Sequence, residues 1–424
     1  MAMTDLAIVG RSLTSRWFAT ATTVLTVGVA VGLLLVLVSL RSAGEQAFAR
    51  GTGNMHLLVS ADSSPLNSVL NSVFYMGNPA AAKPLSAFAA LRADPRVSWA
   101  IPVVQGDSFQ GYPTLATTNE FFTSFEPARG SPWRFEQGAG FKNTFDVVLG
   151  AEAAAGTGLR VGDHLHLTHG THDESGHAHE HDEFHFEISG ILAPSATAHD
   201  RAIFTTTEAT WLIHATDLRE SARNPVAPTV QNLRDDEKVI TGLYIRVKGR
   251  ANTDAPPALQ ELYAELRKDG TITVAQPGSQ VASLFKVVGG IDRIIFALAA
   301  AVLVSSSITI MLVLYQAMEL RRRQVAVLRV LGASRFRVFM LALTEAAVIG
   351  IAASLLGVAV AFVGAHSVAF AVYQSIGLTI SPSLDLRWVI SIVAGATALA
   401  CLAGIVPAAV AYRTDVLRSL RPIG

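Results

Sequence analysis

The sequence predicts a membrane α-helical protein with four transmembrane helices and a large α+β extracytoplasmic domain inserted between the first and second helices. Three observations predict this fold class. Hydrophobic residues make up 50% of the chain, charged residues only 16%, and the mean hydropathy is +0.40. Four apolar stretches are long enough to cross a bilayer core, which takes about 20 helical residues. Residues 43–286, of mixed polarity, separate the first stretch from the other three.

The four predicted spans and the segments between them follow from where the apolar runs begin and end. The spans are 18–42, 287–318, 338–372 and 388–412. Arginines are concentrated in three of the remaining segments, which are 1–17, 319–337 and 413–424. The positive-inside rule assigns these three segments, and with them both termini, to the cytoplasm. Residues 43–286 and the short loop 373–387 are then expected on the outer side.

Composition also excludes some classes of protein. The formal net charge is zero, which argues against a nucleic-acid binder, because phosphate recognition normally requires an excess of Lys and Arg. Cys401 is the only cysteine, so no intramolecular disulfide can form. A cleaved signal peptide is the alternative for the first span. Its apolar run is too long for the 7–15-residue core of such a peptide.

The segment between the second and third spans predicts a short interfacial helix followed by a turn. It reads "MELRRRQVAVLRVLGASRFRVFMLALTEAAVIG" from Met318. Val325, Leu328 and Leu331 recur at helical spacing, which is typical of an amphipathic helix lying along the membrane surface. Gly332 can end that helix and Ser334 can begin the next one. We call residues 319–337 the elbow.

The elbow resembles the corresponding segment of the FtsX/MacB-type ABC transporter permeases, whose pattern there reads approximately E-x-R-R-R-E-I-A-V-L-R-A-L-G-A. The C-terminal "GIVPAAVAYRTDVLRSLRP" and the opening "LAIVGRSLTSRWFATATTVLTVGVAVGLLLVLVSL" are similar to the two ends of the same family, and "LVSADSSPLNSVLNSVFY" to the start of its MacB-like periplasmic domain. Gln324 departs from the pattern, because the family usually has Glu at that position.

The resemblance implies a permease subunit of the bacterial inner membrane that works as a homodimer or heterodimer on a separate ATP-binding subunit. The elbow would dock on that subunit through Glu319, Arg321, Arg322, Arg323, Gln324, Val327, Leu328, Arg329, Leu331, Gly332 and Ala333. No G-x-x-x-x-G-K-[ST] phosphate loop occurs in the sequence, so we expect no intrinsic ATPase and no intrinsic cofactor. ATP would act through the partner.

The inserted domain divides by pattern into two lobes. A helix at 84–92 precedes the strand "RVSWAIPVV", and the strand "VITGLYIRVKG" precedes a helix at 257–268 and the strand "TITVAQP". We expect these strand and helix units to pair into one α+β lobe. Residues 115–235 between them are rich in short strands and predict a second lobe. The helices that enter and leave the domain near Leu40 and Lys286 would carry motion to it.

A histidine-rich segment, 164–187, lies within this domain and contains eight of the twelve histidines. "DHLHLTH" and "EFHFEISGIL" both alternate, which predicts a hairpin with Leu165, Leu167, Phe184, Phe186 and Ile188 on its core face. The other face would then carry His164, His166, His185 and Glu187. Imidazole and carboxylate groups in this arrangement can approach one Zn²⁺ at the ligand distance of roughly 2 Å.

The polar stretch between the two strands offers further metal ligands, namely His169, His172, His177, His179 and His181. Such a stretch binds borderline divalent metals through many ligand sets, with zinc the first candidate. A solvated loop without a ligand is the alternative. "HDEFH" is one substitution from the H-E-x-x-H hydrolase motif. That motif needs a helix, whereas residues 184–192 alternate as a strand.

The sequence is therefore compatible with three functions. The first is a permease that couples ATP hydrolysis by its partner to motion of the outer domain, for export or extraction of a periplasmic or outer-leaflet substrate linked to divalent metal. The second is an FtsX-like signalling or scaffold protein that activates a periplasmic protein or lipoprotein without transport. The third is metal sequestration by the histidine-rich segment alone. Isolated His56, His199 and His214 are expected to be ordinary surface or hydrogen-bonded residues.

Overall fold

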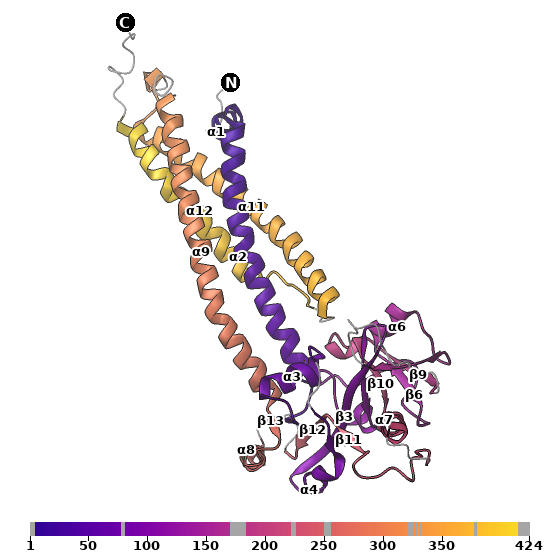
Figure 1. Ribbon diagram of the computed structural model, residues 1–424. Coiled ribbons are helices and arrows are strands. Elements are labelled where there is room, and N and C mark those ends of the chain that lie inside the picture. Colours follow the sequence, from indigo (N-terminus) through magenta and orange to yellow (C-terminus); the bar gives the residue numbers. More distant parts are fainter. Residues whose placement is uncertain are drawn as a thin grey trace. The chain divides into compact units, whose positions relative to one another are not determined.

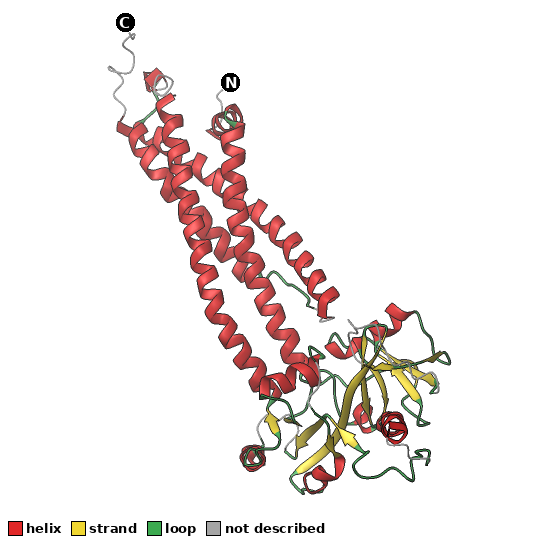
Figure 2. Ribbon diagram, in the orientation of Figure 1, coloured by secondary structure: helices red, strands yellow, loops and turns green. Residues whose placement is uncertain are grey.

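A computed structural model describes residues 5–77, 81–169, 184–221, 226–249, 256–320, 326–327, 329–330, 332–376 and 380–413. The chain divides into two compact units. The first, which we call the helical unit, contains residues 1–43, 287–371 and 381–424. The second, the α/β unit, contains residues 44–286 and 372–380. Strands occur only in the α/β unit within the described part of the chain, as Figure 2 shows.

The helical unit contains a short N-terminal helix and four helices that are long and apolar enough to cross a membrane. The short helix is α1 (Asp5–Ser15), and the long helices are α2 (Trp17–Gly51), α9 (Pro277–Leu320), α11 (Arg335–Ile376) and α12 (Leu386–Arg413), labelled in Figure 1. This agrees with the predicted four-span layout. Two of the long helices, α2 and α9, extend well past the predicted spans, and α1 was not predicted as a helix.

Glycines allow α2 and α11 to approach each other backbone to backbone. A Cβ atom added at Gly357 would lie 2.6 Å from Val31 Cγ1 and 2.9 Å from the carbonyl oxygen of Gly28. A Cβ atom at Gly32 would in turn lie 2.9 Å from Val360 Cγ1. Glycines four residues apart on one helix face are a common means of close packing between membrane helices. Here they bring the first and third spans into direct contact.

The α/β unit is built on one mixed sheet with the strand order β13-β1-β12-β3-β4-β10-β6-β9-β5. Short strands β7 and β8 join it beside β9 and β3, and β11 pairs with β2 as a separate ribbon. The strands are β1 (Leu57–Ser60), β2 (Lys83–Pro84), β3 (Val97–Phe109), β4 (Tyr112–Thr117), β5 (Phe135–Gly138), β6 (Asp146–Leu149), β7 (His164–Leu165), β8 (Thr168–His169), β9 (Phe186–Leu192), β10 (Ile203–Thr206), β11 (Val239–Ile240), β12 (Gly242–Val247) and β13 (Thr273–Ala275).

Short helices lie between these strands. They are α3 (Pro65–Phe74), η1 (Leu85–Phe88), α4 (Ala89–Arg92), α5 (Glu120–Thr123), α6 (Ala151–Thr157), η2 (Ala198–Arg201), α7 (Thr207–Ser221) and α8 (Pro257–Leu266). Helix α3 shows why they form where they do. Ser64 caps it by accepting a hydrogen bond from the Asn67 N–H, and Pro65 occupies its first turn.

Long strand β3 joins the two predicted lobes in one sheet. Its first half pairs antiparallel with β12, from Val97 to Val103, as expected for the first lobe. Its second half pairs with β4, with an irregularity in register after Gln105. A bulge increases the local twist of a strand. The strand-rich second region therefore continues the sheet of the first rather than forming a sheet of its own.

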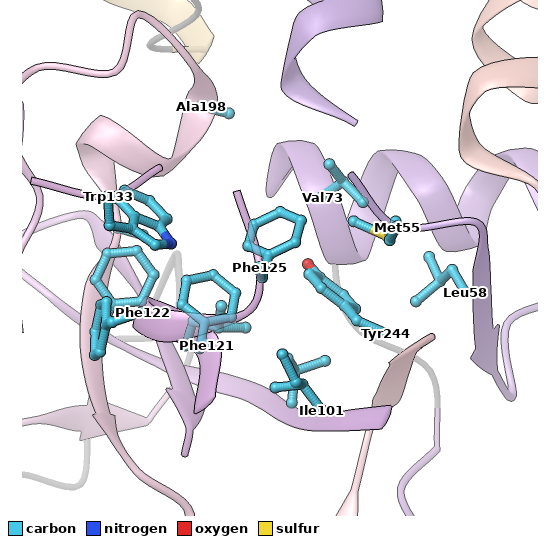
Figure 3. Close-up of a cluster of buried hydrophobic side chains, with 14 of the residues drawn as sticks. Met55, Leu58, Val73, Ile101, Phe121, Phe122, Phe125, Trp133, Ala198 and Tyr244 are labelled. Carbon is cyan, nitrogen blue, oxygen red and sulfur yellow. The ribbon is translucent and has the colours of Figure 1, made fainter. Parts of the chain in front are cut away.

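The largest buried cluster of the α/β unit is rich in aromatic rings. Phe121 lies at its centre, with ring centroids 4.9 Å from Phe125, 5.3 Å from Phe204 and 5.6 Å from Trp133. Figure 3 shows Phe121 between Phe122 and Phe125, with Tyr244 beside them. Rings at such separations gain more than their buried area alone supplies. We call this cluster the aromatic core. It contains residues from several strands and from helices α2, α3 and α9.

Candidate functional site

The elbow leads into helix α11, and its C-terminal part has the turn that the sequence predicts. Gly332 adopts a positive φ of 98°, which suits glycine because it lacks a Cβ atom. The side chain of Ser334 accepts a hydrogen bond from the Arg337 N–H at 3.2 Å and so caps α11. Ala326, Val327, Arg329 and Val330 are helical. Arg321, Arg322, Arg323, Gln324, Leu328 and Leu331 lie outside the described residues.

Helix α1 is attached to the beginning of α11 by charged groups that sequence reasoning missed. The Arg337 guanidinium donates to the Asp5 carboxylate at 2.7 Å on the exposed surface. Deeper in the unit, Arg16 lies 2.5 Å from Glu345, whose carboxylate also accepts a hydrogen bond from the Ser12 hydroxyl at 2.7 Å. The Glu345 side chain is only 7% exposed. It is therefore buried and paired, and it does not reach the membrane surface as an exposed charged side chain would.

Arg16 joins three helices because it stands at the turn between α1 and α2. Besides Glu345 on α11, its guanidinium donates to the Ser12 hydroxyl and, at 3.4 Å, to the carbonyl oxygen of Val313 on α9. A charge in a membrane span is costly unless it has a partner. Glu345 alone could have signalled this site, since it is a carboxylate within an apolar run, but nothing local identifies its partner.

The ends of two long helices belong to the aromatic core of the α/β unit. Ala47 near the end of α2 and Val281 near the start of α9 are both buried in it. Phe48 contacts Phe285 across these two helices with ring centroids 5.7 Å apart, and it lies 4.6 Å from Phe74 of α3. Any displacement of either helix end must therefore disturb the packing of this core.

The end of α11 also belongs to the α/β unit. The hydroxyl of Tyr373 hydrogen-bonds to the Glu152 carboxylate on α6. Ile380, which follows the helix, packs against the aromatic core. The two helices that flank the elbow, α9 and α11, therefore both have their other ends among residues of the α/β unit.

His199 is a buried histidine at the edge of the aromatic core, not a surface residue. Its Nδ1 lies 2.7 Å from the Tyr75 hydroxyl, and its ring is surrounded by Phe121, Phe125 and Trp133. Burial lowers the pKa of His199 to about 3, because an imidazolium ion would lose its hydration there. Burial also raises the pKa of Tyr75 well above its usual value, so this hydroxyl keeps its proton and can donate it to neutral His199.

The base of the predicted histidine hairpin forms, but it is shorter than predicted. His164 is the register partner of Glu187, and Leu165 is the partner of Phe186. Further along, β8 leaves β9 and pairs with β3 instead, with His169 opposite Asp107. The predicted hairpin pairing is therefore confirmed at His164 and Leu165, and β8 lies outside it. The alternating pattern fixes which side chains are buried, but it does not specify the neighbouring strand.

The two faces of this strand pair are divided as the alternation predicts. Leu165, Leu167, Phe186 and Ile188 are buried, and Phe184 is half-buried. On the opposite face, the rings of His166 and His185 lie 4.7 Å apart, centre to centre. His164, His185 and Glu187 also line a pocket of about 580 Å³ together with Lys142, Asn143, Thr144, Phe145 and Asp146.

Four of the predicted metal ligands have described side chains, namely His164, His166, His185 and Glu187. His172, His177, His179 and His181 lie outside the described residues, as does the side chain of His169. Among the described residues, no three His, Cys, Asp or Glu side chains are already gathered around one point that could hold a metal ion. Sequence reasoning missed Lys142 and Asn143, whose turn is held by hydrogen bonds from their N–H groups to Asp146.

Two family models match most of the chain. The model of the MacB-like periplasmic core domain matches residues 20–262, and that of the FtsX-like permease C-terminal region matches residues 296–416. The chain belongs to the FtsX/MacB-type permeases. As a member of this family it is a multi-pass protein of the bacterial inner membrane with an ABC transporter permease or FtsX-like role, and permeases of this type work with an ATP-binding subunit.

Among solved structures, the permease is similar to the periplasmic region of MacB from Actinobacillus actinomycetemcomitans. The two share 12% sequence identity with a TM-score of 0.32, over 56% of this chain and 94% of that one. None of the curated proteins compared with the permease matches it.

Proposed function

We propose that this permease couples ATP hydrolysis by a separate ATP-binding subunit to a movement of its α/β unit on the opposite side of the membrane. The observation that carries the proposal is the placement of α9 and α11. Both flank the elbow at one end, and at the other end they contribute Val281, Phe285 and Tyr373 to the α/β unit. An α-helix is stiff enough over such lengths to transmit displacement as one element.

The elbow is the proposed docking surface for the ATP-binding subunit. Its residues would be Glu319, Arg321, Arg322, Arg323, Gln324, Val327, Leu328, Arg329, Leu331, Gly332 and Ala333. Two observations support this role. Val327 and Val330 are exposed apolar side chains, and the elbow ends in a capped turn at Ser334 that joins it directly to α11. With the elbow in the cytoplasm, both termini lie there as well.

Polar contacts of α1 and Arg16 link this docking surface to the rest of the helical unit. Ion pairs fix α1 to α11 at Arg337 and Glu345, and Arg16 also bonds to the backbone of α9. A push on the elbow would therefore move α1, α9 and α11 together. The substrate would be a molecule taken from the periplasm or outer leaflet, and the working form a dimer of permeases.

The first experiment tests coupling in lipid nanodiscs. The permease is combined in turn with each ATP-binding subunit of this family from the same genome, and binding and ATPase rate are measured. One subunit should bind and change its ATPase rate. Hydrogen exchange of residues 44–51 and 277–286 should then differ between ATP-trapped and nucleotide-free complexes. A permease that neither binds nor modulates any such subunit would contradict the proposal.

A matched pair of variants tests the route of coupling. Phe285→Ala removes the ring that contacts Phe48, whereas Val287→Ala alters a 73% exposed side chain two residues further along the same helix. Both variants should bind the ATP-binding subunit as the wild type does. Only Phe285→Ala should lose the ATP-dependent change in exchange at residues 44–51. Equal behaviour of the two variants would refute the role of this contact.

A further inference from the structure

The four described polar residues on the outer face of the histidine hairpin lie next to one another. His164 and Glu187 are register partners on β7 and β9. Two residues further along, the rings of His166 and His185 lie 4.7 Å apart, centre to centre. Side chains two apart on one strand share a face. His164, His166, His185 and Glu187 therefore occupy the corners of a single four-residue patch, which we call the hairpin patch.

The separation of the two rings fits a shared metal ion. Zinc is bound by imidazole nitrogen at roughly 2 Å in tetrahedral geometry, which requires the centres of two ligating rings to lie roughly 5 Å apart. The observed 4.7 Å is close to that value. In addition, Nδ1 of His166 is buried and has no hydrogen-bond partner. A buried ring nitrogen without a partner is costly, and a metal ion bound there would satisfy it.

The patch is held on a rigid support, which favours a defined site. Leu165, Leu167, Phe186 and Ile188 on the inner face are all buried in one cluster with β6 and β10. A slip of register by one residue would exchange this apolar face for the histidines, so the register is strongly determined. The support leaves the ligands room to adjust, since His164, His185 and Glu187 are exposed. Among the described residues these groups are not yet gathered around one point, so a bound ion would require rotation of these exposed side chains.

The neighbouring pocket gives a metal ion access to the patch. Three of the four patch residues line it, and its volume of about 580 Å³ admits a hydrated ion. Asp146 also lines the pocket, but its carboxylate already accepts hydrogen bonds from the N–H groups of Lys142 and Asn143. Asp146 therefore shapes the turn, and the ligands come from the patch.

We propose that His164, His166, His185 and Glu187 form a binding site for one Zn²⁺ at the base of the hairpin, and that this site needs no residue from the segment 170–183. Three imidazoles and one carboxylate form a ligand set suited to zinc rather than to Mg²⁺ or Ca²⁺, which prefer oxygen. The proposal is independent of the coupling function, because zinc binding is measured on the permease without its ATP-binding subunit.

The test uses the full-length permease in detergent, purified through a tag without histidine and stripped with a chelator. In one variant, a Gly/Ser sequence of equal length replaces residues 170–183. Zinc is titrated against a chromophoric chelator at pH 7.5. This variant should still bind one zinc per chain, and X-ray absorption should report three imidazoles and one carboxylate. Adding His166→Asn and His185→Asn should weaken binding by more than about 100-fold, because even changes outside the ligand shell cost about 10- to 100-fold.

Two controls separate loss of the site from loss of the fold. His366→Asn, in the same background, removes an exposed imidazole on α11 and should bind zinc as its parent does. Glu187→Gln preserves the size of an exposed side chain and should still weaken binding. Circular dichroism and thermal unfolding must match across the set. The proposal is overturned if the Gly/Ser variant binds no zinc, or if the paired histidine variant binds it as tightly as its parent.

Discussion

In the helical unit, the buried side chains of the largest cluster are Val, Ala, Leu and Ile, whereas the aromatic core of the α/β unit contains Phe, Trp and Tyr. Each unit also buries a charged pair, Arg16 with Glu345 in the helical unit and Arg219 with Glu237 in the α/β unit, and the α/β unit buries His199 as a neutral ring. In both units the buried ion pair joins two opposite charges, whereas the apolar side chains of the largest cluster differ in kind.

The surrounding solvent explains the difference. In water, burial of large apolar surfaces drives folding, so aromatic rings supply most stability per residue. In lipid the surroundings are as apolar as the side chains, so helix association depends on close packing and on polar contacts. Glycines such as Gly357 and ion pairs such as Arg16–Glu345 therefore do in the helical unit what Phe121 and its neighbours do in the α/β unit.

The largest effect is expected from breaking the charged pair. Glu345→Ala leaves the guanidinium of Arg16, only 20% exposed, without its carboxylate. Loss of one partner of a buried pair costs about 3–5 kcal/mol, because the remaining charge stays desolvated. SDS-induced unfolding of the permease in mixed micelles should therefore begin at a much lower SDS fraction than in the wild type.

The exposed pair between Asp5 of α1 and Arg337 of α11 provides the control. Asp5 and Arg337 are both about half exposed, and Asp5→Asn should cost less than about 1 kcal/mol, as exposed pairs do. The double variant Arg16→Met with Glu345→Leu should recover much of the loss, since both charges are gone. If Glu345→Ala unfolds like Asp5→Asn, the buried pair does not hold the helical unit together.

A smaller effect is expected from adding one methyl group between α2 and α11. The new Cβ in Gly357→Ala would lie 2.6 Å from Val31 Cγ1 and 2.9 Å from the Gly28 carbonyl oxygen, so the helices must separate. Overpacking of this kind costs about 1–3 kcal/mol. Gly395→Ala on α12 meets no atom within 4 Å and should leave stability unchanged or raise it slightly. Equal SDS unfolding midpoints for the two variants would argue against close backbone packing.

The features that sequence analysis predicted depend on local patterns. Apolar length identifies the four spans, and short runs of strand-forming residues identify β3 and β12. Alternation identifies the buried face of the hairpin, including Leu165 and Phe186. Likewise, Gly332 and Ser334 signal a turn by their own chemistry. Each of these properties can be read within one or two turns of helix or along a few residues of strand.

The features that were missed depend on contacts between distant segments. Asp5 and Arg337 are 332 positions apart, and Arg16 and Glu345 are 329 apart. No periodicity in either segment indicates such partners. The pairing of β8 with β3 was missed for a similar reason. Strand β8 has only two residues, and Asp107 of β3 lies 62 residues upstream of its partner His169. His199 has no local pattern around it, and its burial results from rings supplied by several elements.

His199 permits the last test, which asks whether the aromatic core of the α/β unit excludes an unpaired charge. Its pKa in the folded state is about 3, below the ordinary value of 6.5 that applies after unfolding. Between those two values the unfolded chain binds a proton that the folded chain excludes. The free energy of unfolding should therefore fall as the pH decreases from about 6.5 toward 3, by up to about 1.4 kcal/mol per pH unit from this residue. Above pH 6.5 its contribution is complete and constant.

Chemical denaturation followed by tryptophan fluorescence at pH 7.5, 6.5, 5.5 and 4.5 would measure this slope. His199→Gln should reduce it, while His366→Gln, which alters an exposed ring of the helical unit, should not. The difference between the two variants removes the contribution of carboxylates that titrate in the same range. If His199→Gln keeps the full slope, the buried ring takes up a proton without loss of stability. The inference that the aromatic core keeps His199 neutral would then be wrong.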